Sequence, residues 1–136
     1  MPKPFWAYEV NCFLYPEAVA EFLIFLDAHV KQLLALNCFY SVDVYEPEED
    51  CNCPAGAVTV TVVYKIRTRE DLKHYFQNTA PEMKAHTIAK FGSKIVGSTH
   101  RIMMHNKHIN KKTWCKTCSL FLLACFKCFI EAANSN

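Results

Sequence analysis

The sequence predicts an α+β fold, because segments with the periods of strands and helices follow one another in the order β, α, β, β, α, β. An acidic, proline-containing connection between the second and third strands is a further sign, since it predicts a hairpin. This order is that of the ferredoxin-like split unit, an antiparallel four-stranded sheet with both helices on one face. The chain has 136 residues, of which 51% are hydrophobic, enough for one packed core, which we expect over residues 5–104.

The first three elements follow from apolar periodicity. Side chains alternate between apolar and polar over residues 6–14, which predicts a strand. Pro16 suits a first helical turn, and apolar residues then recur every three or four positions, so a helix is expected over residues 16–36. Alternation resumes over residues 40–44 and predicts the second strand.

The second half of the domain repeats this alternation of elements. Residues 46–56 form the exposed connection, and residues 58–66 give the cleanest β pattern in the chain. A helical region is expected over residues 69–91, kinked or divided where Pro81 enters it. Residues 95–104 predict a last strand, but apolar residues occur at both its odd and even positions, so the pattern does not fix its register.

Capping signals mark the ends of this helical region. Thr68 with Asp71 resembles a capping box, and Thr79 with Glu82 makes a second one at the predicted kink. Gly92 follows Phe91 and is expected at the left-handed cap position that ends the helix.

The sheet face away from the helices is expected to be bare and polar. On one consistent assignment, it carries Glu9, Asn11, Ser41, Asp43, Thr59, Thr61 and Lys65, together with His100 or Arg101. The candidate pocket consists of Glu9, Asn11, Asp43, Lys65 and His100. Proton transfer by His100, Glu9 and Asp43 is one interpretation. Cross-strand ion pairs among Glu9, Asp43 and Lys65 are the favoured one, so no catalytic residue is assigned.

The expected partner is a second copy of the chain. The bare face would expose apolar side chains that a monomer leaves uncovered, namely Phe13, Phe39, Tyr45 and Val63. A two-fold homodimer is the commonest way to cover such a face. The net charge of +2 gives no reason to expect a nucleic acid, and no cofactor is expected in this domain.

Residues 105–136 have a different composition, with four cysteines in two C-x-x-C pairs, Cys115, Cys118, Cys125 and Cys128. Such pairs can bind zinc, but the short apolar segment between them lacks the turn that a zinc site needs. The apolar stretch also admits membrane association, although Lys116 and Lys127 interrupt it. An amphipathic helix docked on its own domain or on a partner is the favoured interpretation, and a disordered tail is the alternative.

The chain is expected to be cytoplasmic. Its N-terminal residues lack the charged and apolar regions of a secretory signal. Without export, its eight cysteines are expected to be reduced thiols, with Cys12 and Cys38 acting as small core residues.

Several short segments resemble a known family: Tyr8-Glu9-Val10-Asn11, Cys38-Phe39, Arg69-Glu70-Asp71-Leu72, Ala80-Pro81 and Phe91-Gly92-Ser93-Lys94-Ile95-Val96. The resemblance covers residues 7–104 and is to a small family catalogued only as a domain of unknown function, within the dimeric α/β-barrel superfamily. It implies that the bare sheet faces of two subunits meet to form a barrel. It also implies that the barrel can hold small aromatic or polyketide-like molecules, which some superfamily members bind or oxidise. It implies no catalytic residues.

Three functions remain open at this point. The favoured hypothesis is a non-catalytic, dimeric binding or interaction module. The alternative is a small cofactor-independent enzyme, oxygenase-like or isomerase-like, that acts on an apolar or aromatic metabolite. The second alternative is membrane or zinc association through residues 105–136.

Overall fold

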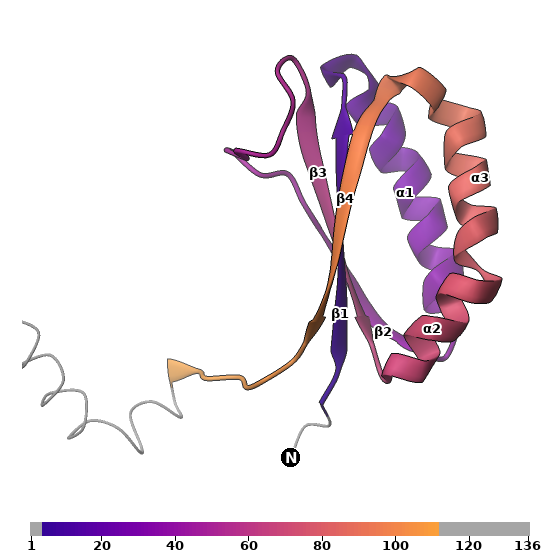
Figure 1. Ribbon diagram of the computed structural model, residues 1–136, viewed down its shortest axis with the longest axis vertical. Coiled ribbons are helices and arrows are strands. Elements are labelled where there is room, and N and C mark those ends of the chain that lie inside the picture. The colour runs from indigo at the N-terminus through magenta and orange to yellow at the C-terminus, as the bar shows by residue number, and fades with distance from the viewer. Residues whose placement is uncertain (1–3, 112–136) are drawn as a thin grey trace, which may run out of the picture. The chain divides into compact units, whose positions relative to one another are not determined.

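The computed structural model describes residues 4–111. Four strands form one antiparallel sheet in the order β2-β3-β1-β4: β1 (Trp6–Leu14), β2 (Phe39–Tyr45), β3 (Val58–Ile66) and β4 (Ile95–Met104). The helices are α1 (Val19–Leu34), α2 (Arg69–Asn78) and α3 (Ala80–Phe91), with short 3-10 turns η1 (Pro16–Ala18) and η2 (Gly92–Lys94). All three α-helices cover one side of the sheet, and the β2–β3 connection projects from the other (Figure 1). The predicted ferredoxin-like α+β fold is confirmed.

The core lies between the helices and the sheet face that they cover, here called the helix face. Even-numbered residues of β1 and β3 share this face, because Val10 pairs with Val62 and Tyr8 with Tyr64. The largest fully buried side chains are Leu14, Leu33, Val60, Val62, Ile66 and Leu72. Burying each of them stabilises the fold by about 1.5–3 kcal/mol, so the strand alternation in the sequence translates directly into the core.

Helix α3 is attached at its C-terminal end. Its one buried side chain is Phe91, whose ring makes edge contacts with Phe22 (5.4 Å between centroids, 71°) and Phe25 (5.2 Å, 73°) of α1. The rest of α3 is exposed or only partly buried. The helix therefore contacts α1 at its C-terminal end and leaves space between itself and the sheet.

The helix ends differ in part from the predictions. The first helix begins as the 3-10 turn η1 and ends at Leu34, inside the expected range 16–36. The Thr68 hydroxyl accepts a hydrogen bond from the Asp71 N–H (3.0 Å), which confirms that cap. The predicted box at Thr79 is wrong: its side chain makes no capping bond, because its backbone is already helical (φ −113°, ψ −44°) between α2 and α3. Gly92 has the expected positive φ (48°), but its ψ of −121° lies outside the left-handed helical region.

Residues 106–111 are grouped apart from the domain that ends at His105. Cys115, Cys118, Cys125 and Cys128 lie outside the described residues, so zinc binding and membrane association through this segment stay predictions. Within residues 4–111, no helix is long and apolar enough to cross a membrane. The same residues contain no group of three side chains suited to hold a metal ion. The cytoplasmic location also stays a prediction.

Candidate functional site

The register of β4 decides which residues can form a site. Glu9 pairs with Arg101, and Val10 pairs with His100. Because neighbouring side chains point to opposite faces of a sheet, Arg101 shares the face of Glu9 while His100 lies on the helix face. Arg101, one of the two alternatives that the sequence left open, therefore takes the place beside Glu9 on the open side of the sheet. Of the five predicted pocket residues, Glu9, Asn11 and His100 line one cleft, whereas Asp43 and Lys65 do not line it.

A polar network occupies the sheet face away from the helices, here called the open face. Arg101 makes a bidentate ion pair with Glu9, with Nε–Oε1 and Nη2–Oε2 distances of 3.0 and 3.1 Å. The Asn11 amide donates to Glu9 (3.2 Å) and to the Thr99 hydroxyl (3.4 Å), while the Thr61 hydroxyl donates to Asn11 (2.6 Å). The Arg101 hydrogen bonds hold the pKa of the Glu9 carboxyl below its usual value. This arrangement stabilises the pairing of β3, β1 and β4.

The other two predicted site residues stand apart from this network. Asp43 is exposed on the edge strand β2, and the β3 residue Val63 lies between it and Glu9 in the same cross-strand row. The Lys65 ammonium lies over the Phe5 ring, 5.3 Å from its centroid. Neither residue takes part in an ion pair within residues 4–111. The ion pairs predicted among Glu9, Asp43 and Lys65 are therefore not found within residues 4–111. Glu9 does form a cross-strand ion pair, but its partner is Arg101.

The β2–β3 connection lies over part of the open face. The Thr59 hydroxyl donates to the Asp50 carboxylate of this connection at 2.7 Å. Between the connection and the sheet is a polar cleft of about 560 Å³, here called the open-face cleft, lined by Glu9, Asn11, Pro47, Glu49, Asp50, Asn52, Thr61, Thr99, His100 and Arg101. The open face is thus less bare than the sequence suggested.

Two of the four aromatic and aliphatic residues expected to be exposed are buried. Phe13 is 5% exposed, with its ring against Gly97 of β4. Phe39 is 6% exposed and packs against Tyr64 and Tyr75 in the core. A register shift between Phe39 and Ser41 turns Phe39 towards the helices, against the simple alternation of β2. Tyr45 is exposed as predicted, and Val63 is half-buried.

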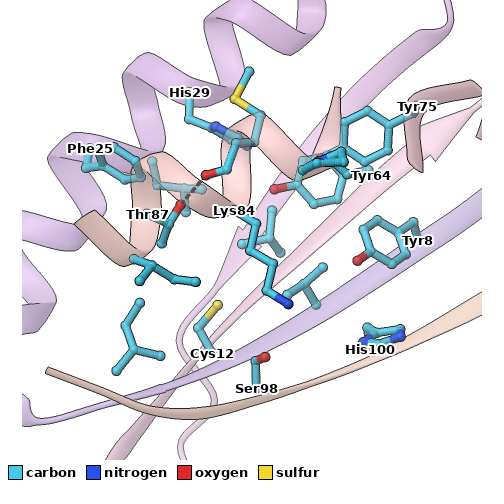
Figure 2. Close-up of a pocket in the computed structure, with 18 of the residues that line it drawn as sticks. Tyr8, Cys12, Phe25, His29, Tyr64, Tyr75, Lys84, Thr87, Ser98 and His100 are labelled. Carbon is cyan, nitrogen blue, oxygen red and sulfur yellow. Dashed lines mark hydrogen bonds between the residues drawn. The ribbon is translucent and has the colours of Figure 1, made fainter. Parts of the chain in front are cut away.

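A second and more apolar cleft lies on the helix face, between α3 and the sheet, and is here called the helix-side cleft. Its volume is about 680 Å³. The floor is formed by buried residues of the sheet and helices, Phe22, Leu26, Val62, Tyr64 and Tyr75. Exposed residues of α3 and β4 form its mouth, namely Pro81, Lys84, Ile88, Ser98 and His100. Figure 2 shows the side chains of this cleft and the space between them.

Burial keeps several polar groups of the helix-side cleft uncharged. Desolvation raises the pKa of the Cys12 thiol to about 11 and that of Tyr75 to about 12. The pKa values of Tyr8 and Tyr64 are also raised, chiefly by burial. Burial lowers the pKa of His29, whose ring stacks on Phe25 at 6.2 Å. At neutral pH these residues offer hydrogen-bond donors and an imidazole acceptor, and they carry no charge.

Few features of the sequence indicate this cleft. His29, Lys84 and Thr87 line it, but none of them is among the site residues that the sequence predicts. One signal in the sequence is Thr87, a small and polar residue on the inward side of α3 that does not fill the space beneath that helix. The Thr87 hydroxyl instead donates to the Met83 carbonyl at 2.9 Å.

Fold and site together define a ferredoxin-like α+β domain with a cleft of ligand size beneath its helices. A family model described as "Domain of unknown function (DUF4286)" matches residues 6–106, and the chain belongs to this family. Comparison with curated proteins gives no match.

Similar folds occur among solved structures. One is a variant of SnoaB, a cofactor-independent oxygenase from Streptomyces nogalater, with a TM-score of 0.58, 10% identity and coverage of 78% of this chain and 98% of that one. Another is a dimeric ferredoxin-like protein from an uncultured marine organism, with a TM-score of 0.56, 12% identity and coverage of 78% and 98%. At these identities the likeness establishes the fold.

Proposed function

We propose that this domain is a binding module that holds a small apolar or aromatic molecule in its helix-side cleft. The observation that carries the proposal is the cleft itself. Its volume of about 680 Å³ lies within the range of small-molecule sites, roughly 300–1,000 Å³. Its floor is aromatic and aliphatic, and a few polar groups reach into it, which is the usual composition of such a site.

Neighbouring residues of β4 provide a matched test, because their side chains lie on opposite faces. Ser98 lines the helix-side cleft, and Thr99 lies on the open face. Both are exposed on an edge strand, so tryptophan is tolerated at either position. The uncharged fluorescent probe phenylnaphthylamine should bind the full chain, and Ser98→Trp should weaken its affinity by about tenfold or more, equivalent to about 1.4 kcal/mol. Thr99→Trp should change the affinity by less than about twofold. Equal effects of the two substitutions would exclude the helix-side cleft as the binding site.

The module is proposed to work as a homodimer that buries the open face. Half-buried Val63 and Met103 lie there among the polar side chains, beside exposed Tyr45. A similar fold is described as a dimeric ferredoxin-like protein, which supports this assembly. A two-fold axis through the open face would cover these side chains in both copies.

Sedimentation analysis of the full chain tests the dimer. Val63→Asp places a charge in the middle of the open face and should convert the dimer into a monomer. Ile24→Asp is the control, because Ile24 is 74% exposed on α1, away from the open face, and this variant should stay dimeric. A monomeric parent chain would refute the assembly but not the binding function of the cleft.

A cofactor-independent enzyme is the second candidate. It is favoured by the fold shared with a cofactor-independent oxygenase and by the position of His100 at the cleft mouth, 6.2 Å from the Tyr8 ring. There His100 could take a proton from a bound phenol or acidic carbon. Oxygen uptake with a dihydroxynaphthalene as substrate, lost in His100→Ala, would support this candidate. If the domain is only a binding module, neither the parent chain nor His100→Ala should consume oxygen.

A further inference from the structure

The two clefts differ in the charged side chains that line them. The open-face cleft contains the carboxylates of Glu9, Glu49 and Asp50 and the guanidinium of Arg101. Among the residues that line the helix-side cleft, Lys84 is the one Lys or Arg, and none is Asp or Glu. A molecule inside the helix-side cleft therefore meets a cation without a neighbouring carboxylate to neutralise it.

Lys84 lies where its charge can contact a molecule in the cleft. It extends from α3 across the mouth of the cleft towards the strand that carries Ser98 and His100 (Figure 2). None of the ion pairs within residues 4–111 involves Lys84, whereas Lys31, Lys94 and Arg101 all have carboxylate partners. Its ammonium is thus available to pair with a charge on a ligand.

The groups deeper in the cleft add hydrogen-bond donors but no competing negative charge. The Cys12 thiol and the tyrosine hydroxyls are protonated at neutral pH, because thiols and phenols ordinarily titrate above it and burial raises their pKa values further. Ser98 adds a hydroxyl close to the mouth. Donors around one cation are the arrangement that binds an anionic group, and a hydrogen bond to a charged group contributes about 1.5–3 kcal/mol.

We propose that the ligand of the helix-side cleft is an acidic amphiphile: an apolar, preferably aromatic body that bears one anionic group such as a carboxylate. The body lies on the aromatic floor, and the anion pairs with Lys84 at the mouth. This inference rests on the proposed binding function and specifies the class of ligand. It makes Lys84 the residue that distinguishes acids from uncharged molecules of the same shape.

Two fluorescent probes with the same aromatic body separate the contribution of the apolar body to the affinity from that of the anionic group. Anilinonaphthalene sulfonate carries an anionic group, whereas phenylnaphthylamine does not. The full chain should bind the sulfonate more tightly. Lys84→Met keeps an unbranched side chain but removes the charge, and it should weaken sulfonate binding by about tenfold or more, from the loss of a charged hydrogen bond. Binding of phenylnaphthylamine should change by less than about twofold.

Two further variants serve as controls. Lys84→Arg keeps the charge and should retain sulfonate binding within about threefold, since the contact needs a cation at this position. Lys73→Met removes an exposed lysine of α2 that does not line the cleft, and it should affect neither probe. Equal losses for both probes in Lys84→Met, or no loss for the sulfonate, would refute recognition of an anion while leaving the binding function in place. If neither probe binds the parent chain, the binding function itself is wrong.

Discussion

Phe91 is the residue whose removal should most clearly show how α3 is held. The ring is 3% exposed and lies in edge contact with two rings of α1. Burial of a phenylalanine side chain contributes about 1.5–3 kcal/mol, and each aromatic pair adds about 0.5–1.5 kcal/mol. Phe91→Ala should therefore reduce the free energy of unfolding by about 3–5 kcal/mol, the usual range for such truncations. This is a large part of the 5–15 kcal/mol that stabilises an ordinary domain.

Urea unfolding followed by circular dichroism measures this change. Phe91→Leu keeps most of the apolar volume and should cost less than about 1.5 kcal/mol. Ile88→Ala truncates a side chain of the same helix that is 57% exposed, and it should change stability by less than about 0.5 kcal/mol. Because α3 forms one wall of the helix-side cleft, Phe91→Ala should also weaken probe binding. A loss of stability below about 1 kcal/mol would refute the anchoring of α3 through this ring.

Two further predictions concern a helix cap and the open-face ion pair. Thr68→Ala removes the bond that the Asp71 N–H donates to the Thr68 hydroxyl and should cost about 1 kcal/mol in urea unfolding, whereas Thr79→Ala should change stability by less than about 0.5 kcal/mol because that hydroxyl caps nothing. Equal losses of stability in the two variants would contradict the assignment of Thr68, and not Thr79, as a helix cap. Since the Arg101 contact lowers the pKa of Glu9 below its usual value of 4.5, the Glu9 charge stabilises the fold above that pH, and this contribution is lost as the pH falls through the lowered value. The stability advantage of the parent chain over Glu9→Gln should therefore shrink on acidification, and an advantage independent of pH would exclude a role for the charge.

The strands were predictable almost to the residue, because alternation over a half-buried sheet leaves a direct trace in the sequence. The ranges 6–14, 58–66 and 95–104 coincide with β1, β3 and β4. The division of the last helical region near Pro81 was also predictable, since proline is favoured in a first helical turn. These features depend on local side-chain chemistry, which is why the sequence alone indicates them.

The helix-side cleft was not predictable by the same means. Phe91 anchors α3 at its C-terminal end, whereas the cleft is lined along the rest of the helix by residues that are only partly buried or exposed, such as Ala80, Met83 and Thr87. The distance between a helix and a sheet is a property of tertiary packing, and no period in the sequence encodes it. His29 shows the consequence, because its burial depends on residues from α1 and α3 that are far apart in the chain.

The register of β4 connects the two faces of the sheet. As an edge strand it is only partly covered on each face, so apolar residues occur at both odd and even positions and the pattern is ambiguous. The ambiguity is resolved by the partner strand, where Glu9 stands opposite Arg101 and binds it with both carboxylate oxygens. A shift by one residue would bring Arg101 to the helix-side cleft and His100 to the open face. The ion pair between Glu9 and Arg101 favours the register in which Arg101 lies on the open face. The same register places His100 at the mouth of the helix-side cleft. Glu9, on one face of the sheet, therefore influences which side chains line the cleft on the other face.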